Sequence, residues 1–297
     1  MPGFINVIRN TLTELVGPAD LAPAELPAGL PAAVLPAARA GVALLTDYQS
    51  PTYAQLYCDR LRRFIGRRGV DDALFVEIAR LLATRMAYLD ATRIAQLKLQ
   101  EPPGQGRGSV DVRRFRCDEL LGALPVIAGG PLLQAFEIIG CAHRTVPIRF
   151  SNAGWWGVQR LKLESSLRHS RRLSARYAVE RVWAERWLHM IDRALTKRPD
   201  AVAAIVQTAS MIEGYGTGYR HGVAAWHQII DGLAKPVFDG TLVLPDLSAA
   251  ITRTRHVPRD PKGEELRKVI EEIRAGALLP SPLVGEGGRA SARTGEG

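Results

Sequence analysis

SARYAVERVWAERWLHMIDRALTK, residues 174–197, is the stretch that decides the fold. Trp183, Trp187 and Ile191 recur in it at helical spacing, with arginines and glutamates between them. The pattern predicts a long amphipathic helix that ends before Pro199. The two tryptophans are four residues apart and share one face, which is more typical of a core than of a stacking platform. Such a face needs other helices to cover it.

Helical spacing continues on both sides of this stretch. It runs through residues 37–100, where Ser50-Pro51 and Asp71 or Asp72 are expected to start helices, and returns in 201–213 and 261–275. The short apolar runs of 109–150 fit either buried helix turns or strands. We therefore expect a mainly α protein, a multi-helix bundle with a mixed or irregular segment around 109–150.

The domain boundaries follow from composition. Residues 1–17 are predicted to form an amphipathic helix, interpreted as a remnant of a missing upstream domain, and the Ala- and Pro-rich residues 18–36 a linker. The helical domain is expected to span 37–275. The GEGG and GEG repeats of residues 276–297 predict a disordered tail.

Composition and charge place the chain among globular proteins. Of its 297 residues, 46% are hydrophobic and 23% are charged, which disfavours fibrous and disordered classes. The 39 Lys and Arg exceed the 30 Asp and Glu, for a formal charge of +9, so an acidic partner fits the charge balance. The longest uncharged stretches are too short or too broken to span a bilayer, and no secretory signal is recognised.

The three cysteines, Cys58, Cys117 and Cys141, have no paired spacing. This disfavours a disulfide scaffold, structural zinc and an iron–sulfur cluster held by this chain alone. The histidines show no two-ligand spacing on one helix, so no metal site is predicted. The simplest interpretation is a reducing, cytoplasmic compartment.

The glycine cluster GYGTGYRHG, residues 214–222, invites comparison with a dinucleotide-binding loop. Tyr219 stands where that loop needs a glycine, and the cluster follows a helical pattern rather than a strand. A turn between two helices is favoured, with positive φ at Gly214, Gly216 or Gly218 and a close approach of the helices. Templates for common catalytic sites are absent from the sequence.

A basic stripe marks the middle of the chain. Its members are Arg160, Lys162, Arg168, Arg171, Arg172, Arg176, Arg181 and Arg186. Glu164, Glu180 and Glu185 interleave at spacings that form local ion pairs, which favours a solvated or intersubunit face over nucleic-acid binding. An anionic cofactor tail or an acidic protein partner stays open for the stripe.

Four runs in the same order resemble a known family: TDYQSPTYAQLYCDRL (46–61), RMAYLDATRIAQLKL (85–99), SARYAVERVWAERWL (174–188) and IEGYGTGYRHGVAAW (212–226). They are similar to the C-terminal helical region of indolepyruvate:ferredoxin oxidoreductase beta-subunit family proteins, over roughly 37–275. The resemblance points to two sets of candidate ligand or subunit contacts: Tyr88, Asp90, Arg93 and Lys98 in the second run, and Gly214, Tyr215, Gly216, Arg220 and Gly222 in the fourth. This chain has Thr217 and Gly218 where the family usually carries an acidic residue and a Thr. From the residues alone, Asp90, Arg93 and Lys98 could face one cleft, but a local pair of Asp90 and Arg93 on a helix surface is the favoured interpretation.

The resemblance implies an accessory, non-catalytic module of a 2-oxoacid:ferredoxin oxidoreductase that supports oxidative decarboxylation of aryl 2-oxo acids. Thiamine diphosphate and iron–sulfur clusters would sit in partner subunits, above all the catalytic subunit, and none would be bound by this chain. No catalytic residue, membrane contact or nucleic acid is expected. The alternatives are a basic helical binding module for nucleic acid or an acidic protein, or an inactive fragment.

Overall fold

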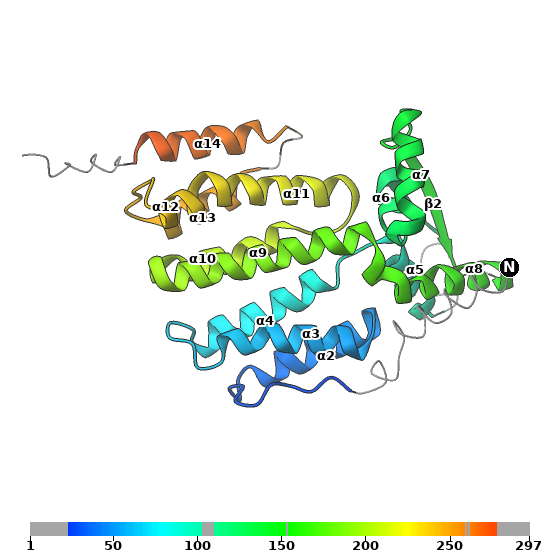
Figure 1. Cartoon of the computed structure of the whole chain (residues 1–297), viewed down its shortest axis with the longest axis horizontal. Coiled ribbons are helices and arrows are strands. Elements are labelled where there is room, and N and C mark those ends of the chain that lie inside the picture. The colour runs from blue at the N-terminus through cyan, green and yellow to red at the C-terminus, as the bar shows by residue number, and fades with distance from the viewer. Residues whose placement is uncertain (1–22, 103–109, 153, 259, 261, 278–297) are drawn as a thin grey trace, which may run out of the picture.

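The computed structural model describes residues 23–102, 110–152, 154–258, 260 and 262–277. The helix expected at 1–17, the first part of the expected linker and the tail beyond residue 277 lie outside them. The described chain is mainly α, with one small antiparallel sheet (Figure 1). Within these ranges no helix is both long enough and apolar enough to cross a membrane.

In the first layer of the bundle, two helices start at the positions predicted from Ser50-Pro51 and Asp71. Its helices are α2 (Leu35–Tyr48), α3 (Pro51–Leu61), η2 (Arg62–Phe64) and α4 (Asp72–Met86). The Ser50 hydroxyl accepts a hydrogen bond from the Tyr53 amide at 3.3 Å, and the Asp71 carboxylate accepts one from the Leu74 amide at 2.8 Å. These caps satisfy amides that the first helical turn leaves free, which fixes both starting points.

The quoted stretch forms the central helix α9 (Ala175–Lys197), which lies between the first layer and the C-terminal helices (Figure 1). The remaining bundle elements are η4 (Pro199–Ala201), α10 (Val202–Gln207), η5 (Thr208–Met211), α11 (Gly216–Ile229), η6 (Ile230–Ala234), α12 (Lys235–Asp239), α13 (Leu247–Arg255) and α14 (Glu264–Ala275). Trp183 and Trp187 are buried in the main core together with Trp226, so the prediction of a core role is confirmed.

The middle of the chain forms what we call the lobe. It contains α5 (Ala91–Gln100), β1 (Val110–Arg116), α6 (Cys117–Gly122), α7 (Val126–Ile138), β2 (Thr145–Ser151) and α8 (Gly154–Ser166), and η3 (Leu167–Leu173) returns the chain to α9. β1 and β2 are antiparallel, with Val110 opposite Ser151 and Arg116 opposite Thr145. The predicted mixed segment around 109–150 is therefore two strands and two helices. The lobe has its own small core around Phe115, Phe150 and Leu161.

The end of the expected linker differs from a free connector. Residues 23–34 are not helical, but Leu26 and Leu30 are half-buried against the main core, and Val34 is fully buried. α2 begins at Leu35, inside the range 18–36, because Pro36 fits the first turn of a helix. The described part of this segment therefore packs against the main core and is not a free linker.

Candidate functional site

Asp90 is the best-connected residue of the second motif. Its Oδ1 accepts a hydrogen bond from the Arg93 amide at 2.6 Å, which caps α5. Its two oxygens also accept bonds from Arg171, at 2.9 Å from Nε and 3.0 Å from Nη2. The Arg93 side chain turns instead to Asp47, at 2.7 Å. The surface pair between the side chains of Asp90 and Arg93 is therefore replaced by a buried contact between the start of α5 and η3.

Asp90 belongs to a set of acidic and basic side chains that we call the arginine cluster: Arg85, Arg171, Arg176, Asp90 and Glu180. All are buried except Arg176, which is partly exposed. Glu180 lies 2.7 Å from Arg85 and 2.9 Å from Arg176. The side chains of Arg85 and Glu180 are each only 5% exposed. Three guanidinium groups thus share two carboxylates, which leaves one formal positive charge in excess. Burying such charges is costly unless they are paired and hydrogen-bonded.

Aromatic rings complete the surroundings of the three arginines. The distances from guanidinium carbon to ring centroid are 3.9 Å for Arg171 over Tyr48, 3.6 Å for Arg176 over Tyr219, 5.6 Å for Arg176 over Tyr88 and 4.9 Å for Arg85 over Trp183. The electron-rich face of a ring attracts a cation, and most strongly where water is excluded. The rings therefore offset the charge that the two carboxylates leave unpaired.

The tyrosines of this cluster are held in their neutral form. Burial raises the pKa of Tyr48 and of Tyr88 well above the usual value of 10, and the neighbouring charge of Asp90 adds to both shifts. The hydroxyl groups of Tyr48 and Tyr88 are both buried without a hydrogen-bond partner. Tyr88 is thus a packing and cation–π partner here, and its phenol is not activated as a base.

The glycine cluster forms the predicted turn at two positions. Gly214 and Gly216 have φ of +72° and +64°, in the left-handed region that glycine tolerates. Gly218 is different, because it lies in α11 with no positive φ. At Gly222 a Cβ atom would come 2.5 Å from the carbonyl oxygen of Met211, which confirms the predicted close approach.

The fourth motif joins the bundle to the lobe. Tyr215 stacks on Phe115 with ring centroids 5.0 Å apart, and the Arg113 guanidinium lies 5.6 Å from the same tyrosine ring. Arg220 of α11 forms an ion pair with Glu119 of α6. These contacts hold β1 and α6 against the start of α11.

The two motifs meet at a small cavity of about 30 Å³. Asp90, Tyr215 and Gly216 line it, with Arg176 between the two motifs. A cavity of this size holds roughly two water molecules, so it is too small for a substrate. The other candidates lie elsewhere: Arg93 on Asp47, Lys98 on Glu101 at 2.5 Å, Arg220 on Glu119, and Gly222 against η5.

Sequence reasoning missed several members of the cluster. Arg85 stands inside the second quoted run but was not singled out, and Tyr48 and Tyr219 stand inside the first and fourth. Glu180 was expected to form a local pair; the pair with Arg176 is present, and Arg85, 95 positions away, shares the same carboxylate. The spacing between residues on one helix carries no signal for such a contact.

The basic stripe is neutralised in part: four of its eight members, Arg160, Arg171, Arg176 and Arg186, pair with carboxylates. The predicted local pairs are confirmed for Glu164 with Arg160 and for Glu180 with Arg176. Glu185 instead pairs across helices with Arg60 at 2.8 Å and Arg63 at 2.7 Å. Lys162, Arg172 and Arg181 are exposed and have no ion pair among the described residues, so the stripe combines structural contacts with free cations.

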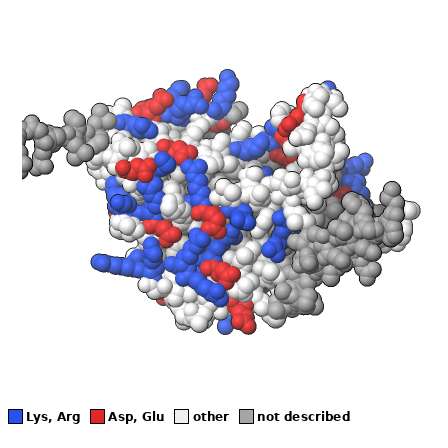
Figure 2. All heavy atoms as spheres, in the orientation of Figure 1, with Lys and Arg blue, Asp and Glu red and all other residues white. Residues whose placement is uncertain are grey.

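The lobe has a large exposed apolar surface, which we call the apolar surface. Its members are Val110, Val112, Val126, Ile127, Leu132, Ile138, Ile139, Val146, Trp155, Trp156 and Leu163. Figure 2 shows mostly uncharged atoms where the lobe projects at the upper right, in contrast with the charged face of the bundle. So many exposed apolar side chains in one lobe are typical of a region that binds a partner.

Comparison with protein families identifies where the chain belongs. A family model described as a family of unknown function (DUF6537) matches residues 34–232. The chain is a member of this family. The matched range of this DUF6537 protein contains both motifs, the arginine cluster and the whole lobe, and it ends before α12. No curated protein and no solved structure gave a match.

Proposed function

We propose that this DUF6537 protein is a cytoplasmic, accessory, non-catalytic module of a 2-oxoacid:ferredoxin oxidoreductase of the indolepyruvate oxidoreductase beta-subunit type. The lobe would bind the catalytic subunit through its apolar surface, and that subunit would carry out the decarboxylation of an aryl 2-oxo acid. The proposal rests on the resemblance of the four runs to that family together with one observation, the unburied apolar helix α7.

α7 packs against α6 but is otherwise left largely uncovered in the described chain. Its 13 residues, VIAGGPLLQAFEI, include a single charged side chain, Glu137, and only Gly129 is buried. Ile127 is 92% exposed and Ile138 is 87% exposed. Removing one such side chain from water contributes about 1.5–3 kcal/mol, so a covering protein would gain substantial binding energy here. A helix this apolar is typical of an interface.

Two neighbouring tryptophans add exposed apolar side chains to the lobe on α8. Trp155 and Trp156 are 63% and 79% exposed, and their rings meet edge to face with centroids 4.5 Å apart. Tryptophan is enriched among the residues that contribute most of the binding energy at protein interfaces. Their position on α8 fits a protein partner that covers both α7 and the first turn of α8.

The motif residues would then position the lobe. Asp90 ties the start of α5 to Arg171, and Arg220 ties α6 to α11, so the lobe is held by ion pairs at two places. The cofactors would be bound by the partner. Cys58 is buried in the bundle core, whereas Cys117 and Cys141 lie in the lobe, and no group of metal-ligating side chains gathers in the described residues.

The test is co-purification of the tagged full-length chain from its own cell extract. We expect an eluate with the broad visible absorbance of iron–sulfur clusters and with indolepyruvate-dependent dye reduction. The double variant Ile127→Glu/Ile138→Glu should lose both signals. Val243→Glu is the control, because Val243 is also an exposed β-branched apolar residue but lies outside the lobe.

Each outcome of the experiment separates the alternatives. A colourless, inactive wild-type eluate would overturn the proposal, and equal capture by the double variant would remove the apolar surface from it. Recovery of nucleic acid that is lost steeply with added salt would favour the basic binding module. Recovery of no partner at all would favour an inactive fragment.

A further inference from the structure

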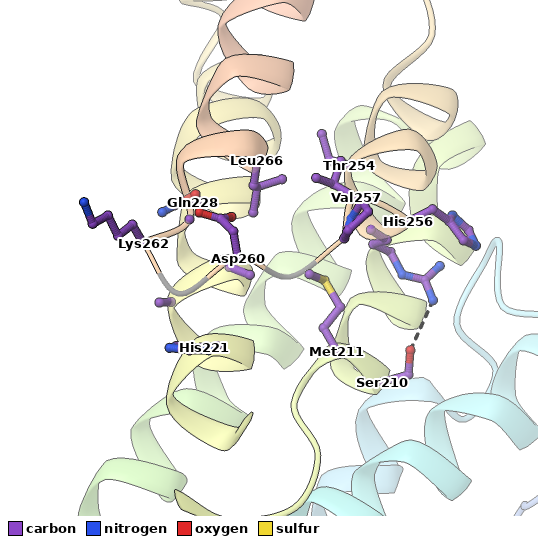
Figure 3. Close-up of a pocket in the computed structure, with 15 residues that line it drawn as sticks. Ser210, Met211, His221, Gln228, Thr254, His256, Val257, Asp260, Lys262 and Leu266 are labelled. Carbon is purple, nitrogen blue, oxygen red and sulfur yellow. Dashed lines mark hydrogen bonds between the residues drawn. The ribbon is translucent and has the colours of Figure 1, made fainter. Parts of the chain in front are cut away.

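A second and larger cavity lies beside α11, where His221, Ala225 and Gln228 line it, and no residue of the lobe contributes to its wall. Its volume is about 200 Å³, and it is enclosed by η5, α11, the end of α13 and the segment that leads to α14 (Figure 3). An engineered cavity of about 150 Å³ holds benzene. The space therefore fits a compact molecule with one ring and a small substituent.

Arg255, at the end of α13, is the least satisfied charged group of this cavity. Its Nη2 donates to the Ser210 hydroxyl at 3.1 Å, drawn as the dashed line in Figure 3. Its Nε is buried without an acceptor, and no carboxylate of the described residues lies within ion-pair distance of it. Arg253, two residues earlier on the same helix, pairs with Glu272 at 2.8 Å. Burial lowers the pKa of Arg255, but a guanidinium remains charged at neutral pH.

The acidic residue of the cavity wall is already engaged. Asp260 accepts a hydrogen bond from the Glu264 amide at 2.7 Å, at the start of α14, and this bond lowers the pKa of Asp260. Its charge is therefore directed to the helix start. Gln228, across the cavity from Ser210 in Figure 3, has its Oε1 buried without a donor. The cavity thus has an unpaired cation and an unpaired amide oxygen.

The rest of the wall is mixed. His221, Thr254, His256 and Lys262 add polar groups to it, and the remainder is apolar. Met211, Ala225, Val257 and Leu266 line the cavity beside Arg255. Inorganic phosphate would satisfy the guanidinium but would leave these side chains against water. An organic anion satisfies both parts of the wall, because an arginine fork matches a carboxylate and the hydrocarbon body displaces water from the apolar side.

We propose that this cavity is a binding site for a small carboxylate with a compact apolar body, about the size of benzoate, whose carboxylate pairs with Arg255. The site is separate from the lobe, so it does not depend on the proposed partner. The structure places its head group at the Arg255–Ser210 pair and its body against Met211 and Leu266.

Titration calorimetry on the purified full-length chain tests the site with three probes: benzoate, benzyl alcohol and inorganic phosphate. We expect benzoate to bind at least tenfold more tightly than either of the others. Equal affinity for benzyl alcohol would overturn the role of the charge, and preference for phosphate would overturn the role of the apolar wall. Absence of benzoate binding would overturn the proposal.

Two variants and one control locate the site. Arg255→Gln should weaken benzoate binding at least tenfold, whereas Arg253→Gln, its exposed neighbour on α13, should leave it unchanged. Ala225→Leu fills the cavity from α11 and should also abolish binding while retaining Arg255. Benzoate affinity that is unchanged in both Arg255→Gln and Ala225→Leu would place the ligand elsewhere and contradict the proposal.

Discussion

Single residues here show how the charge of the basic stripe is used. Arg171 is 3% exposed and makes a two-bond contact with Asp90, while its Nη1 donates to the Tyr48 carbonyl at 2.8 Å. Arg160 stands on the same stripe but is 53% exposed and pairs with Glu164 in water. Arg171 and Arg160 belong to the same stripe in the sequence, but only Arg171 is buried in the structure.

This difference predicts different effects on stability. Arg171→Met leaves the Asp90 carboxylate buried without its partner, so we expect the free energy of unfolding to fall by about 3–5 kcal/mol. Arg160→Met removes an exposed pair and should change it by less than about 1 kcal/mol. Urea unfolding followed by circular dichroism measures both. Similar small losses in the two variants would mean that the Arg171–Asp90 pair does not hold the lobe.

The residues that were predictable are those whose role is local. Trp183 and Trp187 reveal their common face by spacing, and Ser50 and Asp71 cap the helices that follow them in sequence. Asp90 shows the limit of such reasoning. Its cap on α5 is local, but Arg171 is 81 positions away, and only the packing of η3 against α5 brings the two together.

At the scale of elements, the start of α11 combines two kinds of glycine. Gly216 has φ of +64° and requires a left-handed backbone, whereas Gly218 is helical and has open space where a Cβ would stand. The cluster 214–222 therefore serves as a turn that leads into a helix. Gly216 and Gly218 are two residues apart in the same glycine-rich run, but the first needs a left-handed backbone and the second a right-handed helical one.

Alanine substitutions distinguish the two glycines. Gly216→Ala should cost about 1–2 kcal/mol, because a Cβ disfavours the left-handed region. Gly218→Ala should raise stability by about 0.4–1 kcal/mol, because it restricts the unfolded chain and improves helix propensity. Thermal midpoints of both variants provide the measurement. A loss of stability in Gly218→Ala as large as that in Gly216→Ala would contradict the assignment of Gly218 to the helix.

The elements of the lobe were harder to predict than those of the bundle. The runs LLGALPVIAGG and VPIRF have no hydrophobic period that distinguishes a strand from a helix. In addition, β1 pairs with β2, which follows in the sequence only after α6 and α7. α7 is misleading in a further way, since its apolar composition predicts burial and the described chain leaves it exposed. The described chain has no element that covers the exposed apolar side chains of α7.

At the scale of the whole molecule, two cores of unequal size share one chain. The main core joins the helices on both sides of α9, whereas the fully buried side chains of the lobe core are Ile94, Ala95, Phe115, Phe150 and Leu161. A two-stranded sheet is marginal by itself and depends on what packs against it. The lobe is therefore expected to be the less stable part of the free protein.

Hydrogen exchange on the free chain tests this division of stability. Amides of β1, β2 and α7 should exchange at least about tenfold faster than those of α9 and α10, equivalent to roughly 1.4 kcal/mol less free energy of opening. Mass spectrometry of peptides from both regions gives the comparison within one sample. If a partner covers the apolar surface, the same lobe peptides should slow in the complex while those of α10 stay unchanged, because burial of α7 stabilises the lobe alone. Equal protection of lobe and bundle in the free chain would show that the small core suffices, and the exposed apolar helix would then need another explanation.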